Sequence, residues 1–469
     1  MAARSPRLVL RLRATLLGSD PEIWRTVDVD GSLTLAQLHH VLQTALGWQN
    51  QHLHRFTDAD PWERRRGIPR IGRRPRRWLD EWSIMDRFAD DDEPDEDERE
   101  TTIAEAFAHD GPLWYEYDFG DGWTHRIDLI ERVRAEPGER PATVVAGERR
   151  APLEDSGGLG GYEEKLEIIA DPQHPEHEHI KEWMEWVAGP WGSTDPDEFD
   201  PDAVQGELDL LFGGGSDMSG LADPARGIAP DSPIALLAAD LPVPARINLR
   251  RHLHRTGVLD AVQIDADAAA ELVRPYLWLL SRIGEDGMTL TKAGWMPPAA
   301  VLEGMTELGW RDRWIGEANR EDFTAPMLHL RASAERLRLI RKVKGRLELI
   351  ARVRPIAADP SALLDEVTRM LLRQRMSESH RAAGALLVLG IADGTVSTRD
   401  DAERVVLTGL EALGFTDADG RAPDRRWFPA LTEPVREVLR ALGLWKGADR
   451  RVDAPPTAAL RAVARAALR

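Results

Sequence analysis

Residues Tyr115–Leu129 read YEYDFGDGWTHRIDL. Aromatic, β-branched and apolar residues stand on both sides of a short segment of Asp, Phe and Gly, a composition typical of two strands joined by a tight turn. The stretch therefore predicts an antiparallel β-hairpin whose second strand continues to about Val133. It also places two carboxylates, Asp118 and Asp121, close to the imidazole of His125.

The residues around this hairpin mix strand and helix patterns. Alternation of apolar and polar residues predicts strands, and apolar residues three and four apart predict helices. The predicted strands are residues 7–16, 23–29 and 52–57, and the predicted helices are residues 33–46, 103–107, 160–170 and 176–187. Ser32 or Thr34 is a suitable N-cap and Gly47 a suitable terminator for the first helix. Because the two kinds of element do not alternate strictly, we expect an α+β domain over residues 1–210, with a mixed or antiparallel sheet.

Two charged stretches interrupt this domain. Residues 58–78 are rich in Arg, Gly and Pro, and residues 90–100 form an acidic run with one Pro. Such compositions bury little apolar surface, so both predict a surface insertion.

Residues 211–229 contain Gly, Ser and Asp in the composition of a linker, and the chain becomes mostly helical after them. Residues 230–375 predict a winged-helix-like module, because helices are followed by residues 339–350, which alternate about Lys344-Gly345 as a hairpin does. Residues 376–469 predict a second helical module. The predicted helices of this half are residues 266–283, 299–308, 321–339, 379–389, 400–413 and 457–468, with residues 415–428 as an irregular second wing.

Composition limits the classes of function. The chain has 469 residues, ample apolar content and no Cys, which excludes thiol catalysis, disulfides and Cys-ligated metals. No apolar run reaches the roughly 20 residues of a membrane helix, and residues 1–17 lack a signal-peptide core. We expect a bacterial, cytoplasmic protein without membrane contact.

Charge is distributed unevenly. Residues 1–229 carry 25 basic and 48 acidic side chains, and residues 230–469 carry 36 basic and 32 acidic ones, for a net charge of −19. An acidic surface repels phosphate, so DNA contact is expected only in the C-terminal half. The candidate phosphate contacts are Arg336, Arg338, Arg341, Lys342 and Lys344. The alternative is that this basic face docks against the acidic half of the same chain, or against a protein partner.

Three separated segments carry a family resemblance: EIWRTVDVDGSLTLAQLHHVLQTALGWQNQHLHRF (22–56), the hairpin (115–129), and APLEDSGGLGGYEEKLEII (151–169). In this order they resemble the plasmid pRiA4b ORF-3-like family, whose members also carry a mobile-element passenger or resolvase label. The resemblance spans roughly residues 5–205 and implies a compact α+β domain, but no reaction. Many members have Cys-Pro-Pro-Glu where this chain has Ala151-Pro152-Leu153-Glu154, so any thiol role in those members is absent here.

The hairpin and the preceding strand supply candidate site residues. Asp118, Asp121 and His125 could act as catalytic groups, and together with His52 and His54 they could hold zinc, manganese or iron. His52 and His54 alternate across Leu53, which places both imidazoles on one strand face. The alternative is that the two Asp side chains accept backbone N–H groups in the turn and the histidines pack in the core.

Three hypotheses follow. The first is a mobile-element-associated binding or regulatory protein that is not an enzyme and contacts DNA or a partner through its C-terminal half. The second is a metal-dependent, hydrolase-like enzyme that uses the His/Asp cluster. The third is a structural or protein-interaction module.

Overall fold

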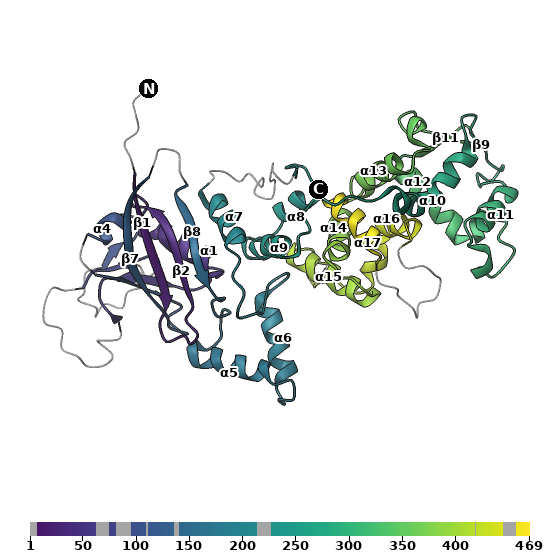
Figure 1. The fold of residues 1–469 in the computed structure, drawn as a ribbon. Coiled ribbons are helices and arrows are strands. Elements are labelled where there is room, and N and C mark those ends of the chain that lie inside the picture. The colour runs from purple at the N-terminus through teal and green to yellow at the C-terminus, as the bar shows by residue number, and fades with distance from the viewer. Residues whose placement is uncertain are drawn as a thin grey trace, which may run out of the picture. The chain divides into compact units, whose positions relative to one another are not determined.

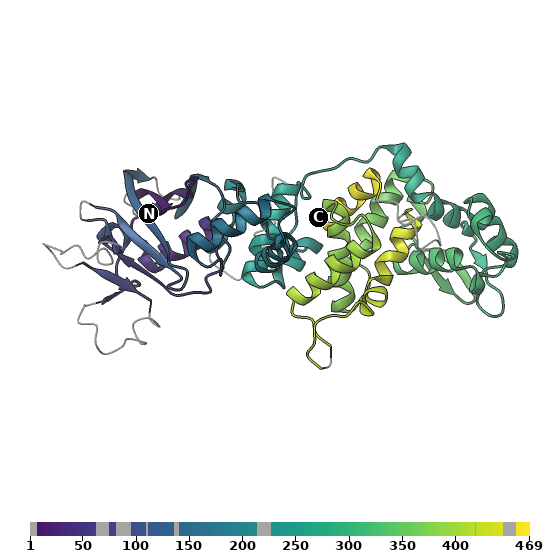
Figure 2. The same cartoon turned by 90° about the horizontal axis from the view of Figure 1, so that it is seen from below.

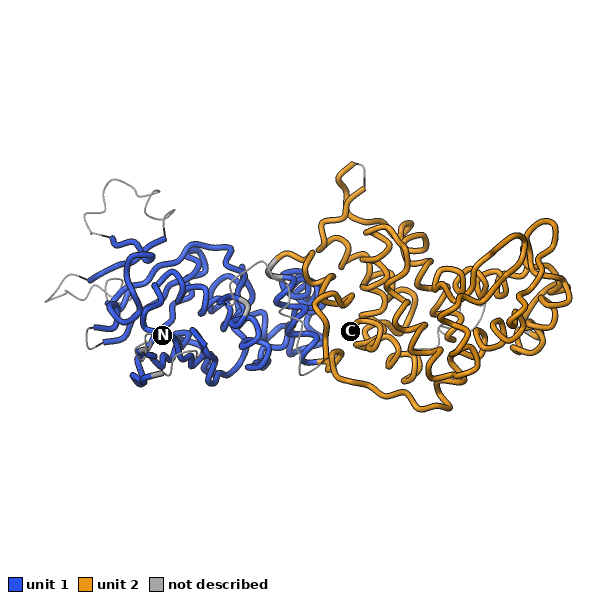
Figure 3. The backbone as a smooth tube through the Cα atoms, turned by 90° about the horizontal axis from the view of Figure 1, so that it is seen from above, with its two compact units in different colours: residues 1–220, 243–255 blue, residues 221–242, 256–469 orange. Residues whose placement is uncertain are grey.

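The computed structural model describes residues 7–61, 75–80, 95–108, 111–135, 140–212, 227–417, 419–443 and 456–469. The chain forms two compact units (Figure 3). Unit 1 contains residues 1–220 and 243–255, and unit 2 contains residues 221–242 and 256–469. The boundaries predicted at residues 210, 229 and 375 stay predictions, and most of the predicted linker lies outside the described residues.

Unit 1 is built on a mixed sheet whose described strands follow the order β5-β4-β3-β6-β7-β1-β2-β8 (Figure 1). The strands are β1 (Arg7–Leu16), β2 (Trp24–Asp30), β3 (His54–Thr57), β4 (Arg77–Leu79), β5 (Asp95–Asp97), β6 (Leu113–Tyr117), β7 (Trp123–Ala135) and β8 (Ala142–Glu148). The β4–β5 pair is parallel and the other pairs are antiparallel. The predicted α+β class is confirmed. The predicted insertion lies largely outside the described residues, and its described ends form strands β4 and β5 at the edge of the sheet.

The predicted hairpin is confirmed as β6–β7. Tyr117 pairs with Trp123 and Tyr115 with His125 across it. The turn between them depends on positive φ angles at Asp118 (56°) and Gly122 (73°), and an Asp tolerates this conformation better than most residues.

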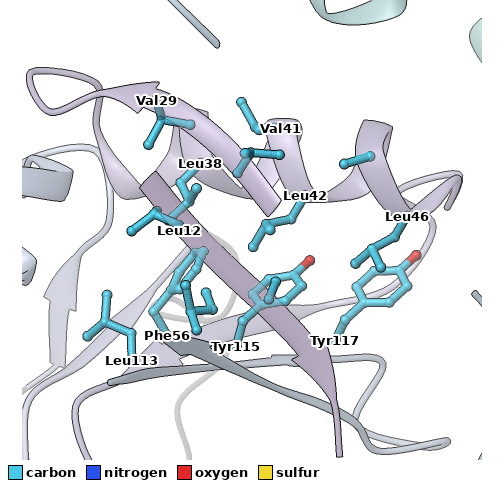
Figure 4. Close-up of a cluster of buried hydrophobic side chains, with 14 of the residues drawn as sticks. Leu12, Val29, Leu38, Val41, Leu42, Leu46, Phe56, Leu113, Tyr115 and Tyr117 are labelled. Atoms are coloured by element: carbon cyan, nitrogen blue, oxygen red, sulfur yellow. The ribbon is translucent and has the colours of Figure 1, made fainter. Parts of the chain in front are cut away.

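Helix α1 (Leu35–Leu46) covers one face of the sheet. Thr34 and Gln37 form a reciprocal capping box at its start, and Gly47 ends it with a φ of 89°. The apolar face of α1 packs on the inward residues of β1, β2, β3 and β6 (Figure 4). The buried side chains drawn there include Leu12, Val29, Leu38, Val41, Leu42, Leu46, Phe56, Leu113, Tyr115 and Tyr117. This contact buries the largest apolar cluster of unit 1 and fixes the end of α1 beside the two tyrosines.

The described residues of unit 1 also form α5 (Gly158–Ala170), α6 (His177–Ala188), α7 (Pro201–Phe212) and α9 (Val243–Thr256, within the unit to residue 255). A short helix, α4 (Ile103–Ala106), lies between β5 and β6. Helix α9 is held to this unit by Asn248, which donates to Ala188 O (2.7 Å), and by Arg251, which donates to Thr44 O (3.0 Å).

Unit 2 is mainly helical. Its elements are α8 (Pro233–Ala239), α10 (Ala266–Ile283), β9 (Met288–Thr289), α11 (Pro298–Glu307), α12 (Ala325–Arg336), β10 (Ile340–Val343), β11 (Arg346–Leu349), α13 (Pro360–Leu371), α14 (Glu378–Asp393), α15 (Arg399–Ala412), α16 (Trp427–Ala441) and α17 (Ala458–Leu468). Helix α14 contacts α15, α16 and α17, and these helices lie side by side in two views (Figures 1 and 2). All residues from 383 to 392 are buried, which is the pattern of a central helix.

Two predictions in unit 2 are wrong. Residues 321–339 do not form one helix: Glu321–Phe323 is a 3-10 turn and α12 begins at Ala325. Pro326 sits at the first turn of α12, where its missing N–H costs nothing. Residues 415–428 form no wing in their described part, because helix α16 begins at Trp427 and buries Phe428. The hairpin about Lys344-Gly345 is confirmed as β10–β11. Within the described residues, no helix combines the length and apolar composition needed to cross a bilayer.

Candidate metal centre

Three segments that are distant in the sequence are tied together beside the β6–β7 turn. They are the loop after α1, the turn itself and the segment before α5. The turn is joined to the loop where Asp118 N donates to Leu53 O (2.9 Å). The loop is joined to the third segment where Gln49 N donates to Glu154 Oε1 (2.9 Å). These backbone contacts hold the side chains of all three segments in fixed positions.

The carboxylate of Asp118 divides its two oxygens between the turn and its neighbours. Oδ1 accepts hydrogen bonds from Gly120 N (2.9 Å) and Asp121 N (3.3 Å). Oδ2 lies 3.6 Å from His52 Nε2. One oxygen therefore stabilises the turn, and the other faces an imidazole.

His52 faces three carboxylates at once. Its Nε2 lies 3.6 Å from Asp118 Oδ2, 3.7 Å from Glu154 Oε2 and 3.6 Å from Asp155 Oδ1. The ligand atoms of His52, Asp118 and Asp155 all lie within 4.8 Å of one another. We call His52, Asp118, Glu154 and Asp155 the carboxylate cluster.

The separations between His52 Nε2 and the three carboxylate oxygens are too long for hydrogen bonds, and the mutual separations of His52, Asp118 and Asp155 suit a shared cation. Tetrahedral ligands about 2.1 Å from zinc lie roughly 3.4 Å from each other. His52 Nε2 and Glu154 Oε2 are buried and have no hydrogen-bond partner among the described residues. Since buried polar atoms are normally satisfied, a cation between them would supply what both atoms lack.

Two hydrogen bonds to Oε1 orient the Glu154 side chain. Oε1 accepts from Gln49 N (2.9 Å) and from the hydroxyl of Tyr117 (3.0 Å), so Oε2 is held toward His52. Burial raises the pKa of the Glu154 carboxyl, while Gln49 N, the Tyr117 hydroxyl and His52 oppose that rise. Outer contacts of this kind orient the ligands in metal sites. Asp155, whose side chain is 68% exposed, forms the open side of the cluster.

His54 lies in a different environment from His52. Its Nε2 is 2.8 Å from Glu98 Oε2, and its ring stacks on that of His39 with centroids 3.5 Å apart. His39 in turn contacts the Tyr115 hydroxyl (2.9 Å) and Asn50 Oδ1 (2.7 Å). We call His39, His54 and Glu98 the histidine stack. Each histidine in it already has partners.

The structure does not bring Asp121 or His125 into the carboxylate cluster. Asp121 Oδ2 accepts from Gly157 N (3.0 Å), which joins the turn to the start of α5. His125 is fully buried, with its ring edge-on to Trp48 at 5.1 Å between centroids. Burial lowers the pKa of His125 to about 3, so its imidazole stays neutral.

Two ligand candidates were absent from the sequence prediction. Glu154 and Asp155 lie more than 30 residues beyond Asp118, and no periodicity connects the two segments. The available signal was that both acids belong to the third segment that carries the family resemblance.

The basic residues of unit 2 that were predicted to contact phosphate differ in whether they form ion pairs. Arg338, Arg341, Lys342 and Lys344 are exposed at or beside the β10–β11 hairpin. Among these four, only Arg341 forms an ion pair with a described residue, Glu348, at 3.3 Å. Arg336, at the end of α12, is exposed but pairs with Glu437 of α16 (3.1 Å). The basic residues that form no ion pair with a described residue therefore lie at or beside the hairpin and not in α12.

A second group of acids and one histidine lies in unit 2. Ligand atoms of His329, Glu433 and Glu437 come within 4.8 Å of one another. Arginines already neutralise it, because Glu433 pairs with Arg440 (2.9 Å) and Glu437 with Arg336 (3.1 Å). This group therefore resembles an ion-pair network and not a metal site.

Comparisons with known proteins cover unit 1. The family model of plasmid pRiA4b ORF-3-like proteins matches residues 8–205. The chain is 35% identical over 191 residues to the uncharacterized protein y4hQ of Sinorhizobium fredii, which covers 40% of this chain and 84% of that relative. A crystal structure of a protein of unknown function from Methanosarcina mazei Go1 matches with 29% identity and a TM-score of 0.34, over 42% of this chain and 98% of the other.

Proposed function

The chain belongs to the plasmid pRiA4b ORF-3-like family, and we propose that its family region binds a divalent cation through the carboxylate cluster. One observation carries the proposal: a single imidazole nitrogen lies 3.6–3.7 Å from three carboxylate oxygens, and two of these atoms, His52 Nε2 and Glu154 Oε2, are buried and have no hydrogen-bond partner among the described residues. The ligands would be His52, Asp118, Glu154 and Asp155.

The ligand types narrow the choice of cation. One imidazole and three carboxylates suit zinc, manganese or ferrous iron, whereas calcium and magnesium prefer oxygen ligands alone. The exposed side of Asp155 leaves room for a water molecule at the ion. A bound metal lowers the pKa of such a water, which is the chemistry of metal-assisted hydrolysis. The hydrolase-like activity considered from the sequence would use this site, and a purely binding role would use the same ligands.

Metal content and affinity test the proposal directly. Purified protein, dialysed against Mn²⁺ or Zn²⁺ and then freed of excess ion, should retain close to one equivalent by elemental analysis. Titration calorimetry on metal-free protein should give a single site, and saturating ion should raise the Tm.

A matched pair of variants locates the site. Glu154→Gln removes one ligand charge from the cluster and should abolish the stoichiometric ion. Glu163→Gln removes the same charge from an exposed position on α5 and should leave the ion bound. Absence of bound ion in the unaltered protein, or equal binding by both variants, would refute the proposal.

As a second candidate function, we propose that unit 2 contacts DNA phosphates. The supporting observation is that Arg338, Lys342 and Lys344 are exposed, form no ion pair with a described residue, and lie at or beside a hairpin that follows a helix. The order α10, β9, α11, α12, β10, β11 and the sheet order β10-β11-β9 support the further proposal that this part of unit 2 is winged-helix-like. In such an arrangement the wing tracks the phosphate backbone.

Salt dependence tests this second candidate. Duplex binding, followed by fluorescence anisotropy, should weaken linearly with log salt concentration. The double change Lys342→Gln and Lys344→Gln should lower that slope by about 1.8, since each phosphate contact contributes about 0.9. The double change Arg404→Gln and Arg421→Gln alters net charge equally at two exposed residues outside the hairpin and should not change the slope. Equal effects of the two double variants, or no duplex binding, would exclude the wing as the contact.

A further inference from the structure

Unit 1 contains an arginine-lined pocket that is distinct from the carboxylate cluster. It lies between β2, the end of α1, the segment after β8, the loop before α7, and α9. Its lining residues are Arg25, Ala45, Leu46, Arg150, Trp191, Ser193, Glu198, Phe199, Asp200, Val204, Asn248, Arg251 and Arg255. None of them belongs to the carboxylate cluster.

Positive charge exceeds negative charge in the lining. Four guanidinium groups face the space together with two carboxylates, those of Glu198 and Asp200. Each carboxylate has a structural contact of its own. Glu198 Oε1 accepts from Arg255 (2.7 Å), and Asp200 Oδ1 accepts from Ala203 N (2.9 Å) at the start of α7. The lining residues alone therefore carry an excess of two positive charges, and the nearby acids Glu207 and Asp195 offset part of it at Arg251 and Arg150.

Arg25 is held in place by backbone carbonyls and not by an acid. Its side chain is buried, at 2% exposed, and it donates to Ala45 O (2.7 Å), Trp24 O (2.7 Å), Glu148 O (2.9 Å) and Arg149 O (2.6 Å). Carbonyl groups orient the guanidinium but carry no net charge, so its positive charge is not neutralised by these contacts.

Arg150 and Arg251 retain most of their donors. The side chain of Arg150 makes no hydrogen bond or ion pair to any described residue, although it lines the pocket. The Arg251 side chain donates one hydrogen bond to a described residue, at Thr44 O. Burial lowers the pKa of Arg25 to about 9 and that of Arg150 to about 10, and repulsion from Arg251 adds to both effects. A bound anion would relieve this repulsion.

We propose that the pocket binds a phosphate group. The cavity volume of about 40 Å³ corresponds to roughly three water molecules, which is the scale of a single phosphate and not of a whole nucleotide. The excess of two positive charges matches a phosphate dianion better than a carboxylate monoanion. The guanidinium of Arg150 presents paired N–H donors that match two phosphate oxygens. The source is either free inorganic phosphate or a phosphate monoester whose remainder lies outside the pocket.

Thermal shift and calorimetry with inorganic phosphate test this site on the full-length protein. Phosphate should raise the Tm in a saturable way, and sodium chloride at equal ionic strength should not. Phosphoserine and adenosine monophosphate distinguish the two sources. Binding of these monoesters as well as phosphate supports an open pocket for an esterified group, and binding of phosphate alone supports free phosphate.

Two variants of one residue separate charge from geometry. Arg150→Gln should weaken phosphate binding by about tenfold or more, because a charge-assisted pair of hydrogen bonds is lost. Arg150→Lys keeps the charge and loses the paired donors, so its affinity for phosphate should lie between that of the unaltered protein and that of Arg150→Gln. Arg140→Gln removes an exposed guanidinium that pairs with Asp209 outside the pocket, and it should bind as the unaltered protein does.

The proposal is overturned if neither phosphate nor the monoesters bind specifically, or if Arg150→Gln binds phosphate as tightly as Arg140→Gln. Circular dichroism of each variant without phosphate shows whether it is folded. If Arg150→Gln does not fold, Arg150→Lys against Arg140→Gln decides the same question.

Discussion

His52 and His54 are two residues apart, yet they lie in opposite chemical situations. His54 bonds to Glu98 at 2.8 Å and stacks on His39 at 3.5 Å. His52 faces three carboxylate oxygens at 3.6–3.7 Å, and its Nε2 has no hydrogen-bond partner among the described residues. The imidazoles of the histidine stack have hydrogen-bond partners, whereas the imidazole of the carboxylate cluster faces three carboxylate oxygens beyond hydrogen-bond distance. Lack of a hydrogen-bond partner does not by itself mark a site, because both ring nitrogens of the core residue His125 also lack one among the described residues. The three carboxylate oxygens around His52 Nε2 make the difference.

The largest expected effect is on metal affinity and comes from replacing His52 of the carboxylate cluster. His52→Gln should lower the affinity for Mn²⁺ or Zn²⁺ by more than about 100-fold, since loss of an outer contact alone costs 10–100-fold. The metal-free protein should change in stability by less than about 0.5 kcal/mol, because Nε2 makes no hydrogen bond there. Calorimetric titration and urea unfolding measure the two quantities. An unchanged affinity would place the ion elsewhere.

Replacing His54 of the histidine stack should lower stability and leave metal affinity nearly unchanged. His54→Gln breaks the contact with Glu98, which is 5% exposed, and should lower the free energy of unfolding by about 1.5–3 kcal/mol. Metal affinity should stay within about twofold. A strong loss of metal affinity in this variant, under conditions where it is folded, would mean that the two groups form one site.

A third histidine gives a pH-dependent comparison. Burial lowers the pKa of His125 from 6.5 to about 3, so the unfolded chain binds a proton here at pH values where the folded chain does not. The stability due to neutral His125 is therefore fully present above pH 6.5 and falls as the pH decreases toward 3, by up to about 1.4 kcal/mol per pH unit.

His125→Phe removes this dependence while keeping a buried ring against Trp48. The acid side of its stability profile, measured by urea unfolding between pH 7 and 4, should be less steep than that of the unaltered protein. Part of the slope should remain, because burial also lowers the pKa of His39, to about 2. Identical slopes in the two proteins would show that His125 is protonated in the folded state.

The smallest expected effect concerns the hydroxyl that orients Glu154. Tyr117→Phe removes the donor to Oε1 (3.0 Å) and the acceptor of Gln51 N (3.0 Å). Metal affinity should fall about tenfold, and the free energy of unfolding should fall by about 1 kcal/mol. Metal affinity equal to that of the unaltered protein would show that Glu154 does not depend on this contact for its orientation.

Local patterns in the sequence were sufficient for much of the fold. Alternation located β1 and β2, the capping residues bounded α1, and Gly-containing turns located both the β6–β7 and β10–β11 hairpins. Strand β8 and helices α7, α8, α9, α13 and α16 were not predicted from the sequence. The wing expected at residues 415–428 was wrong because aromatic residues there belong to the start of α16.

The candidate site was predictable only in part. His52 and Asp118 were named from the sequence, since each stands in or near the strands of the hairpin. Glu154 and Asp155 were not, because they reach His52 only after three distant segments join. The same holds for the arginine pocket, whose four guanidinium groups come from β2, the segment after β8, and α9.

The sequence by itself determined the α+β class of unit 1, the hairpin at residues 115–129 and the family, because each depends on short-range patterns. Only the tertiary structure decided which polar atoms meet. Which partners an imidazole meets depends on residues 44 to 103 positions away, and periodicity within one segment holds no information about them.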